Sequence, residues 1–295
     1  MIGEFLDYAI NGALIGLLYA LVAMGFVVIY RASKVFNFAQ GELVVVGGFI
    51  VWWLTLGMGL PWYFAIPLAF LLAAIVGYVI ERLFFSKLVG ESVFSMVMVT
   101  IGLLILIRGI VLVVFGAQVR PFPTIFPLKP IIIGDVLIPQ SLLYGGILAV
   151  IIALALSWFF NQTRTGLKMT ASAEDHQVAL SMGISVRMSI AAAWVMGSVI
   201  STIGAIIFLS GKSLTFLASE IGFIALPVAL LAGLESIGGL ILAGIIMGVV
   251  QGLAEGYLDP IVGGSVGSIL PFFIMVFILF VRPTGLFGWK TIERV

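Results

Sequence analysis

Long apolar stretches with almost no charged residues follow one another along this chain, and they constrain its fold more than any other feature. A helix that crosses the hydrocarbon core of a bilayer needs about 20 consecutive, mainly apolar residues. The stretches that approach or reach this length are 8–30, 43–60, 61–80, 92–116, 140–160, 189–210, 221–234, 236–254 and 266–281. The sequence therefore predicts an all-α, polytopic helical bundle in a membrane, with nine transmembrane spans.

Eight spans are the natural alternative to nine. The second and third stretches are separated only by Gly57, Gly59 and Pro61, and the seventh is short and holds Pro227. Any of these stretches could be broken or re-entrant instead of a full crossing.

Composition excludes other classes of protein. Hydrophobic residues make up 62% of the chain and charged residues 9%, whereas roughly 25% of an average soluble domain is charged. A membrane β-barrel is excluded too, because its strands alternate apolar and polar residues. The net charge of +1 offers no basic patch for nucleic acid. We therefore expect a single transmembrane domain, 1–295, surrounded by lipid.

The basic residues of the loops predict the orientation of the bundle. If the N-terminus lies outside, the outer loops hold only Arg120, Lys129 and Lys212. The inner loops then hold Arg31, Lys34, Arg82, Lys87, Arg164, Lys168, Arg187, Arg282, Lys290 and Arg294. Because cytoplasmic loops are enriched in Lys and Arg, we expect a periplasmic N-terminus and a cytoplasmic C-terminus.

The outer loop 117–139 is rich in proline. Regular helix is excluded there, and an ordered surface on which another protein docks is expected. The prolines are Pro121, Pro123, Pro127, Pro130 and Pro139.

The inner loop 161–188 is the most polar segment of the chain. Its helix formers predict one short cytoplasmic helix over about 170–182, with Ser172 or Thr170 as its N-cap. Glycines at 166 and 183 flank this helix. A solvated loop without a helix is the alternative.

Glycines recur at every fourth residue in the eighth stretch. Residues at this spacing share one helix face and let a neighbouring backbone come close, so they predict tight helix packing. Gly12 and Gly16 form a similar pair in the first stretch. The repeat consists of Gly244, Gly248, Gly252 and Gly256.

Residue types needed for covalent chemistry are scarce in the expected spans. The single histidine, His176, falls in the inner loop, and the chain has no cysteine. A Ser–His pair or a metal site within the bilayer is therefore not expected. The segment 211–213 reads GKS, but a phosphate-binding loop also requires a glycine where Ile206 stands. We expect no catalytic residue, metal or cofactor on this chain.

Polar residues in or beside the spans are candidates for a translocation path. Arg108 lies two-thirds along the fourth stretch, where an uncompensated charge costs about 2.5–3.5 kcal/mol. Its alternative role is snorkelling to the outer headgroups. Asn37, Gln40 and Glu42 stand at the start of the second stretch, and Glu235 lies between the seventh and eighth. The two amides could instead satisfy backbone groups where a span begins irregularly.

A buried carboxylate such as Glu42 would also suit an ion-coupled secondary transporter. A secondary transporter or a channel therefore remains an alternative on the residues alone.

Three segments resemble the permease subunits of branched-chain amino acid ABC importers, in particular the H-type permease. Asn11–Leu43 resembles the family's opening span and its NFAHGE-type motif. Gly166–Ser185 is similar to the cytoplasmic segment that engages the ATPase. Gly222–Leu253 and the closing RPTGLFG, Arg282–Gly288, resemble the C-terminal half. Together these segments cover essentially the whole chain.

The resemblance implies a permease whose transport is driven by ATP on other subunits. The partners it implies are a second permease of similar fold, two cytosolic ABC ATPases that bind ATP and Mg²⁺, and an external solute-binding protein. It also implies a location in the bacterial inner membrane. The residues that it places against the ATPase are Gly166, Ala171, Glu174, Asp175, Val178, Leu180, Met182 and Gly183.

One residue departs from the family pattern. Gln40 stands where the family commonly has His, which removes a titratable group but keeps a hydrogen-bonding side chain. Because the family also includes carriers of urea, short amides and aromatic acids, the resemblance leaves the substrate class open.

Overall fold

The computed structural model describes residues 2–88, 90–127, 129–134 and 136–288 as a polytopic helical bundle, which confirms the predicted fold class. Among these residues, seven helices are long and apolar enough to cross a bilayer, and two further apolar helical segments are shorter. Lys290 and Arg294, which the orientation argument used, lie outside the described part of the chain.

The α-helices are α1 (Ile2–Ser33), α2 (Gln40–Trp52), α3 (Trp62–Leu83), α4 (Val93–Phe115), α5 (Gln140–Gln162), α6 (Arg164–Glu174), α7 (His176–Ser181), α8 (Val186–Leu209), α9 (Glu220–Ala232), α10 (Ile237–Tyr257), α11 (Asp259–Val262) and α12 (Val266–Val281). A π-helical turn, Trp53–Gly57, extends α2. Short 3₁₀ turns, Phe85–Lys87 and Phe216–Ser219, follow α3 and precede α9. The strands are β1 (Arg120–Pro121), β2 (Ile131–Ile133), β3 (Val136–Ile138) and β4 (Ser213–Leu214).

Each predicted stretch overlaps one helix of the structure. The second and third are separate helices, because the π-helical turn ends at Gly57 and Pro61 precedes the first turn of α3. The short segments are 216–232, which includes α9, and 266–281, which is α12. The number of complete crossings, eight or nine, stays a prediction.

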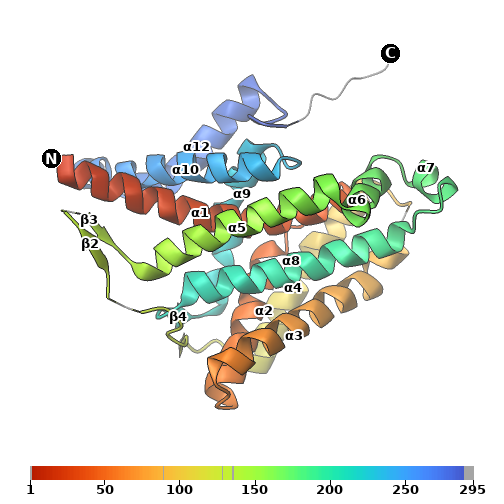
Figure 1. The fold of residues 1–295 in the computed structure, drawn as a ribbon, viewed down its shortest axis with the longest axis horizontal. Coiled ribbons are helices and arrows are strands. Elements are labelled where there is room, and N and C mark those ends of the chain that lie inside the picture. The colour runs from red at the N-terminus through yellow and green to blue at the C-terminus, as the bar shows by residue number, and fades with distance from the viewer. Residues whose placement is uncertain (1, 89, 128, 135, 289–295) are drawn as a thin grey trace.

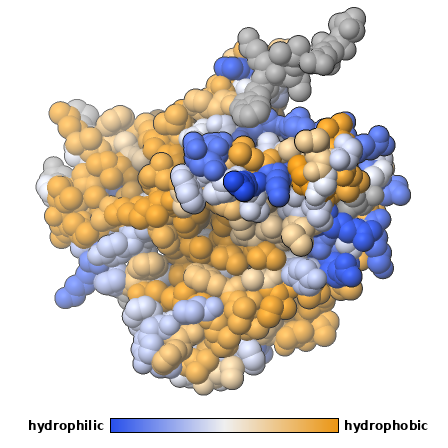
Figure 2. All heavy atoms as spheres, turned by 45° about the vertical axis from the view of Figure 1, so that its right-hand side comes forward, coloured by the Kyte–Doolittle hydropathy of each residue, from blue (hydrophilic) through white to orange (hydrophobic). Residues whose placement is uncertain are grey.

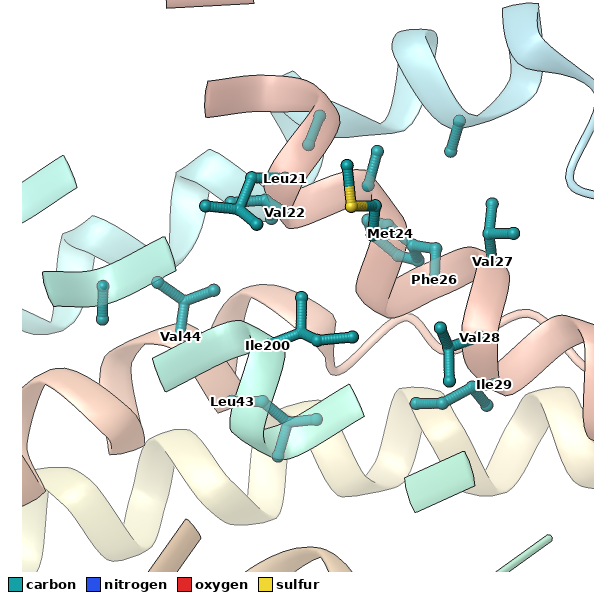
Figure 3. Close-up of a cluster of buried hydrophobic side chains, with 14 of the residues drawn as sticks. Leu21, Val22, Met24, Phe26, Val27, Val28, Ile29, Leu43, Val44 and Ile200 are labelled. Atoms are coloured by element: carbon teal, nitrogen blue, oxygen red, sulfur yellow. The ribbon is translucent and has the colours of Figure 1, made fainter. Parts of the chain in front are cut away.

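Helix α1 forms the centre of the bundle. It packs against α5, α8, α9 and α10, and its most apolar window is 78% buried, against 22% for α4. Figure 3 shows its side chains, among them Leu21, Met24 and Phe26, in one cluster with Leu43 of α2 and Ile200 of α8. The first apolar stretch of the sequence is therefore the core of the molecule.

Helices α1 and α10 touch at their glycines. A Cβ atom on Gly248 would lie 2.6 Å from the Gly16 Cα atom, and one on Gly244 would lie 2.9 Å from the Cβ of Ala20. Both distances are too short for a real contact, so only glycine lets these backbones approach so closely. Two more glycines of the repeat continue this face of α10: Gly252 and Gly256.

The outer helices present apolar side chains away from the core. The most apolar windows of α3, α4 and α5 are only 28%, 22% and 28% buried. Figure 2 shows apolar side chains over much of the surface, with hydrophilic ones gathered in separate patches. An exposed apolar surface of this extent suits lipid, and the chain is a multi-pass membrane protein.

The loops separate to the two ends of the long helices (Figure 1). The strands lie at one end, where β2 pairs with β3 and β1 pairs with β4. The described residues of 117–139 contain no helix, as the prolines predict. The pairing of β1 with β4 joins two loops that were both predicted on the outer side, so it agrees with alternating spans.

At the other end, the loop 161–188 forms two helices where one was predicted. Helix α6 begins after Thr163, whose hydroxyl accepts a hydrogen bond from the Gly166 N–H at 3.1 Å. Gly166 therefore lies within the first turn of α6 and does not precede the helix. Asp175 interrupts the helix because its carboxylate accepts hydrogen bonds from the next N–H groups and caps α7.

The predicted N-caps were wrong, because α6 begins earlier in the chain than the predicted helix. Thr170 and Ser172 lie inside α6, where their hydroxyls donate to the carbonyls of Gly166 and Met169. The prediction for Gly183 was right, since it follows α7 with a φ of 74°, a left-handed conformation that suits glycine at a helix end.

Candidate functional site

The chain turns back into the bundle after α1. Lys34 has a left-handed backbone with a φ of 53°, and residues 34–39 form no helix before α2 starts at Gln40. The Gln40 side chain lies against Gly25 of α1, which is about 12 Å along the helix axis from its end at Ser33. Helix α2 therefore begins inside the bundle and not at its surface.

Asn37 and Gln40 hold this irregular start together. The Gln40 amide donates to the Ser201 hydroxyl at 2.8 Å and to the Val22 carbonyl at 3.4 Å. Asn37 donates to the Gln40 side-chain oxygen at 3.3 Å and accepts from the Ala39 N–H at 3.0 Å. Both amides are fully buried, so they satisfy polar groups at the place where the second span starts.

Glu42 and Arg108 form a salt bridge within the bundle. The Arg108 Nε and Nη2 atoms lie 2.9 and 2.7 Å from the same carboxylate oxygen, Oε1 of Glu42. Arg108 also donates to the Ser219 hydroxyl at 2.9 Å. The salt bridge therefore joins α4 to α2 and to the 3₁₀ turn before α9, and Arg108 is not simply snorkelling.

The starts of α2 and α9 meet beside this salt bridge. A Cβ atom on Gly222 would lie 2.6 Å from the Cα of Gly41, so the two backbones are in contact. The N-terminal end of a helix carries a partial positive charge. Glu42, in the first turn of α2, is stabilised by this charge as well as by Arg108.

A small cavity borders the salt bridge. Its volume is about 10 Å³, which is room for roughly one water molecule. Polar groups of Glu42 and Ser219 face it together with apolar side chains. The apolar side chains are Phe26, Phe36, Phe38, Leu104, Phe223 and Leu226.

A second group of charges lies at the end of the long helices that carries α6 and α7. The Lys34 ammonium contacts Glu174 of α6 at 2.8 Å and also Glu235 between α9 and α10. Burial by itself lowers the pKa of Lys34, but hydrogen bonds and charges of the two glutamates outweigh it and raise that pKa above its ordinary value. Glu235 therefore lies with Lys34, and the structure does not bring it to Glu42.

The partners in these two charged groups could not be predicted from spacing along the sequence. Arg108 lies 66 residues from Glu42 and 111 from Ser219, whereas spacing reveals only neighbours on one helix. One residue did point to the close approach of α2 and α9. This residue is Gly222, because an isolated glycine in a helical stretch often marks a place where another backbone comes near.

A family model for the branched-chain amino acid transport system permease component matches residues 8–279. The chain belongs to this permease family. A transport permease component is not an enzyme.

Full-length relatives of this permease are known from bacteria and archaea. It is 27% identical to the high-affinity branched-chain amino acid transport system permease protein BraD of Pseudomonas aeruginosa, over 99% of this chain and 98% of the relative. It is 26% identical to LivH of Escherichia coli, with the same coverage of both chains. A probable LivH of Methanocaldococcus jannaschii is 24% identical over 94% and 91% of the two chains. No solved structure matches.

The segment of this permease that was expected to contact an ATPase is well exposed. Val178 and Leu180 of α7 are exposed, and Met182 after it is 75% exposed. Ala171, Glu174 and Asp175 also lie at the surface, whereas Gly166 is buried. Exposed apolar side chains on a short helix beyond the ends of the long helices are the kind of surface that another protein covers.

Within the described residues of the permease, no three His, Cys, Asp or Glu side chains are grouped so that they could hold a metal ion.

Proposed function

We propose that this permease is the transmembrane subunit of an ATP-binding-cassette importer. In this proposal it carries branched-chain amino acids, or a related small amphipathic solute, into the cytoplasm by alternating access. Family membership supports the proposal. The structural observation that supports it most is a helix that starts inside the bundle beside a charged pair, since interrupted helices with polar groups at mid-membrane are typical of solute pathways.

The translocation path passes the start of α2 in this proposal. Asn37 and Gln40 shape the interrupted backbone, while Glu42 and Arg108 supply charge at the same depth. Glu235 contributes at the inner end, where it pairs with Lys34. The path is expected to open and close through movement of these elements relative to one another.

The proposed complex contains a second permease of similar fold, two cytosolic ATPases that bind ATP and Mg²⁺, and an external solute-binding protein that docks on the loop 117–139. It lies in the bacterial inner membrane, with the strands at the periplasmic end and α6 and α7 in the cytoplasm. Helix α7 inserts into the ATPase through its exposed apolar side chains, as an amphipathic helix does in a groove.

ATP-driven uptake by the reconstituted complex tests the proposal. Vesicles that contain both permeases and the ATPases, with the binding protein added outside, should accumulate radiolabelled leucine only when ATP is enclosed. Accumulation driven by a proton or sodium gradient without ATP would instead support the alternative, a secondary transporter. Gradient-independent flux in both directions would support a channel.

A variant at the end of α7 tests the coupling. Gly183→Glu forces a charged side chain into a left-handed conformation and disturbs α7, so we expect the complex to remain in the membrane but transport to be uncoupled from ATP hydrolysis. Gly263→Glu is the matched control, because Gly263 has a φ of 70° and open space around it but lies after α11, away from α7. Deletion of α6 and α7 that leaves ATP-driven uptake unchanged would contradict the proposed coupling.

A further inference from the structure

One oxygen of Glu42, Oε2, has no hydrogen-bond partner among the residues that the structure describes. Both hydrogen-bonding contacts from Arg108 go to Oε1, and Oε2 makes no hydrogen bond within the described part of the chain. The side chain is 1% exposed. A buried carboxylate oxygen without a donor is unfavourable, so this position is ready for a donor that arrives with a ligand.

Arg108 also has unused capacity for hydrogen bonds. Its Nε and Nη2 groups are taken by Glu42 and Ser219, whereas its Nη1 group makes no hydrogen bond with a described residue. The Arg108 side chain is 36% exposed. A charged side chain that is partly exposed at membrane depth requires a polar neighbour and not lipid, and the spare N–H groups can donate to an anionic oxygen.

Apolar side chains lie next to Glu42, the acidic member of this pair. Phe26, Phe36, Phe38 and Phe223 border the same cavity as Glu42. Aromatic faces of this kind accommodate an aliphatic side chain and exclude water. The site thus combines one spare acceptor, one spare donor and an apolar surface.

We infer that the Glu42–Arg108 pair binds the zwitterionic head of an aliphatic α-amino acid during its passage. The ammonium group donates to Glu42 Oε2, the carboxylate accepts from Arg108, and the aliphatic side chain lies against the phenylalanines. This inference rests on the proposed function and narrows its substrate class, because urea, short amides and carboxylic acids without an amino group satisfy only part of the site.

The structure shows this site closed. A cavity of about 10 Å³ holds roughly one water molecule, so an amino acid enters only when the walls separate. The contact between Gly41 and Gly222 has no interlocking side chains. It is the seam along which the starts of α2 and α9 move apart to admit the solute.

Binding of three ligands of similar shape tests the inference. Leucine carries both charges, 4-methylpentanoate lacks the ammonium group, and 3-methylbutylamine lacks the carboxylate. Competition against radiolabelled leucine is measured on the purified complex of permeases and ATPases without the binding protein. We expect leucine to bind about 10- to 100-fold more tightly than either analogue, as each loses one charge-assisted hydrogen bond.

The variant Glu42→Gln should abolish the preference for leucine over 4-methylpentanoate, while its amide oxygen can still accept from Arg108. Glu220→Gln is the control, because Glu220 is an exposed carboxylate at the start of α9 and does not border the cavity. Glu42→Asp keeps the charge and provides a second variant if the glutamine variant does not elute as an intact complex. It should weaken leucine binding and leave that of 4-methylpentanoate unchanged.

An unchanged ratio in an intact Glu42→Gln complex would overturn the inference, as would a wild-type complex without preference among the three ligands. The proposed function is decided separately, by ATP-driven uptake of the wild-type complex in vesicles. A failure of the binding inference would leave that result standing.

Discussion

At Gly248 the absence of a side chain allows two helices to touch. The neighbouring atoms are backbone atoms of Gly12 and Gly16 in α1, and they cannot rotate away as a side chain can. Packing in membranes depends on such close contacts, because lipid is as apolar as the side chains that it would replace. The stability of this bundle is therefore sensitive to single added methyl groups at this face.

The variant Gly248→Val should destabilise the bundle strongly. A branched side chain at this position separates α1 from α10, and we expect a loss of about 3 kcal/mol or more in the free energy of unfolding. The thermal unfolding midpoint in detergent measures this effect.

Gly238→Val is the matched control, because Gly238 lies in the same helix and has no neighbouring atom within 4 Å of an added Cβ. Both variants carry the same cost of valine in a helix, so equal shifts of the midpoint would rule out the close contact as the cause.

At the scale of elements, α6 and α7 act as a projection between two long helices. Helix α6 buries Met169 and Ala173 against the bundle, whereas Val178 and Leu180 of α7 are exposed. The break at Asp175 turns the second helix away from the first, and so gives it a surface free for another protein.

The double variant Val178→Glu and Leu180→Glu should separate binding of the ATPase from folding of the permease. Exposed positions tolerate polar residues within about 0.5 kcal/mol, so the unfolding midpoint should stay unchanged while the ATPase no longer co-purifies with the permease. Val119→Glu, an exposed apolar position in the outer loop, is the control. Full retention of the ATPase by the double variant would contradict docking through α7.

Lys34 connects three elements at the end of the bundle that carries α6 and α7. It follows α1, contacts Glu174 of α6 and contacts Glu235 between α9 and α10. Lys34 and Leu234, which precedes Glu235, are the non-glycine residues in the described chain with a positive φ. Such conformations cost energy and persist where surrounding contacts hold them, so this ion-pair group holds two strained turns in place beside α6.

The variant Lys34→Met should lower stability by only about 1 kcal/mol, because Glu174 is more than half exposed and its ion pair is screened by water. The raised pKa of Lys34 gives a distinctive pH dependence. The stabilisation is complete below the ordinary lysine pKa of about 10.4 and is lost as the pH rises through the higher pKa of the folded protein.

Thermal midpoints measured between about pH 8 and pH 11.5 check this. The difference between wild type and Lys34→Met should remain constant up to about pH 10 and shrink beyond it. Lys168→Met, on the exposed face of α6, should show no difference at any of these pH values. A difference that shrinks already near pH 9 would exclude the ion pairs as its source.

For the molecule as a whole, helix positions followed from the sequence because bilayer thickness sets the length of an apolar run. The start of α2 at Gln40 lies three residues before the predicted stretch 43–60, because Gln40 and Glu42 are polar and were left out of the apolar run although both are buried. The break at Asp175 was missed because helix formers stand on both sides of it. The pairing of Glu42 with Arg108 depends on tertiary packing, which periodicity within one segment does not reveal.

The distant partners of Glu42 also set an order of events during synthesis. The segment from Gln40 to Gly57 has a mean hydropathy of 1.4, the lowest among the seven long helices of the described chain. When it leaves the ribosome it carries an unneutralised carboxylate, because Arg108 follows 66 residues later and Ser219 later still. Helix α2 is therefore a poor substrate for the translocon on its own. We expect it to settle at its final depth only after Arg108 and Ser219 have been translated, so that the candidate site assembles late.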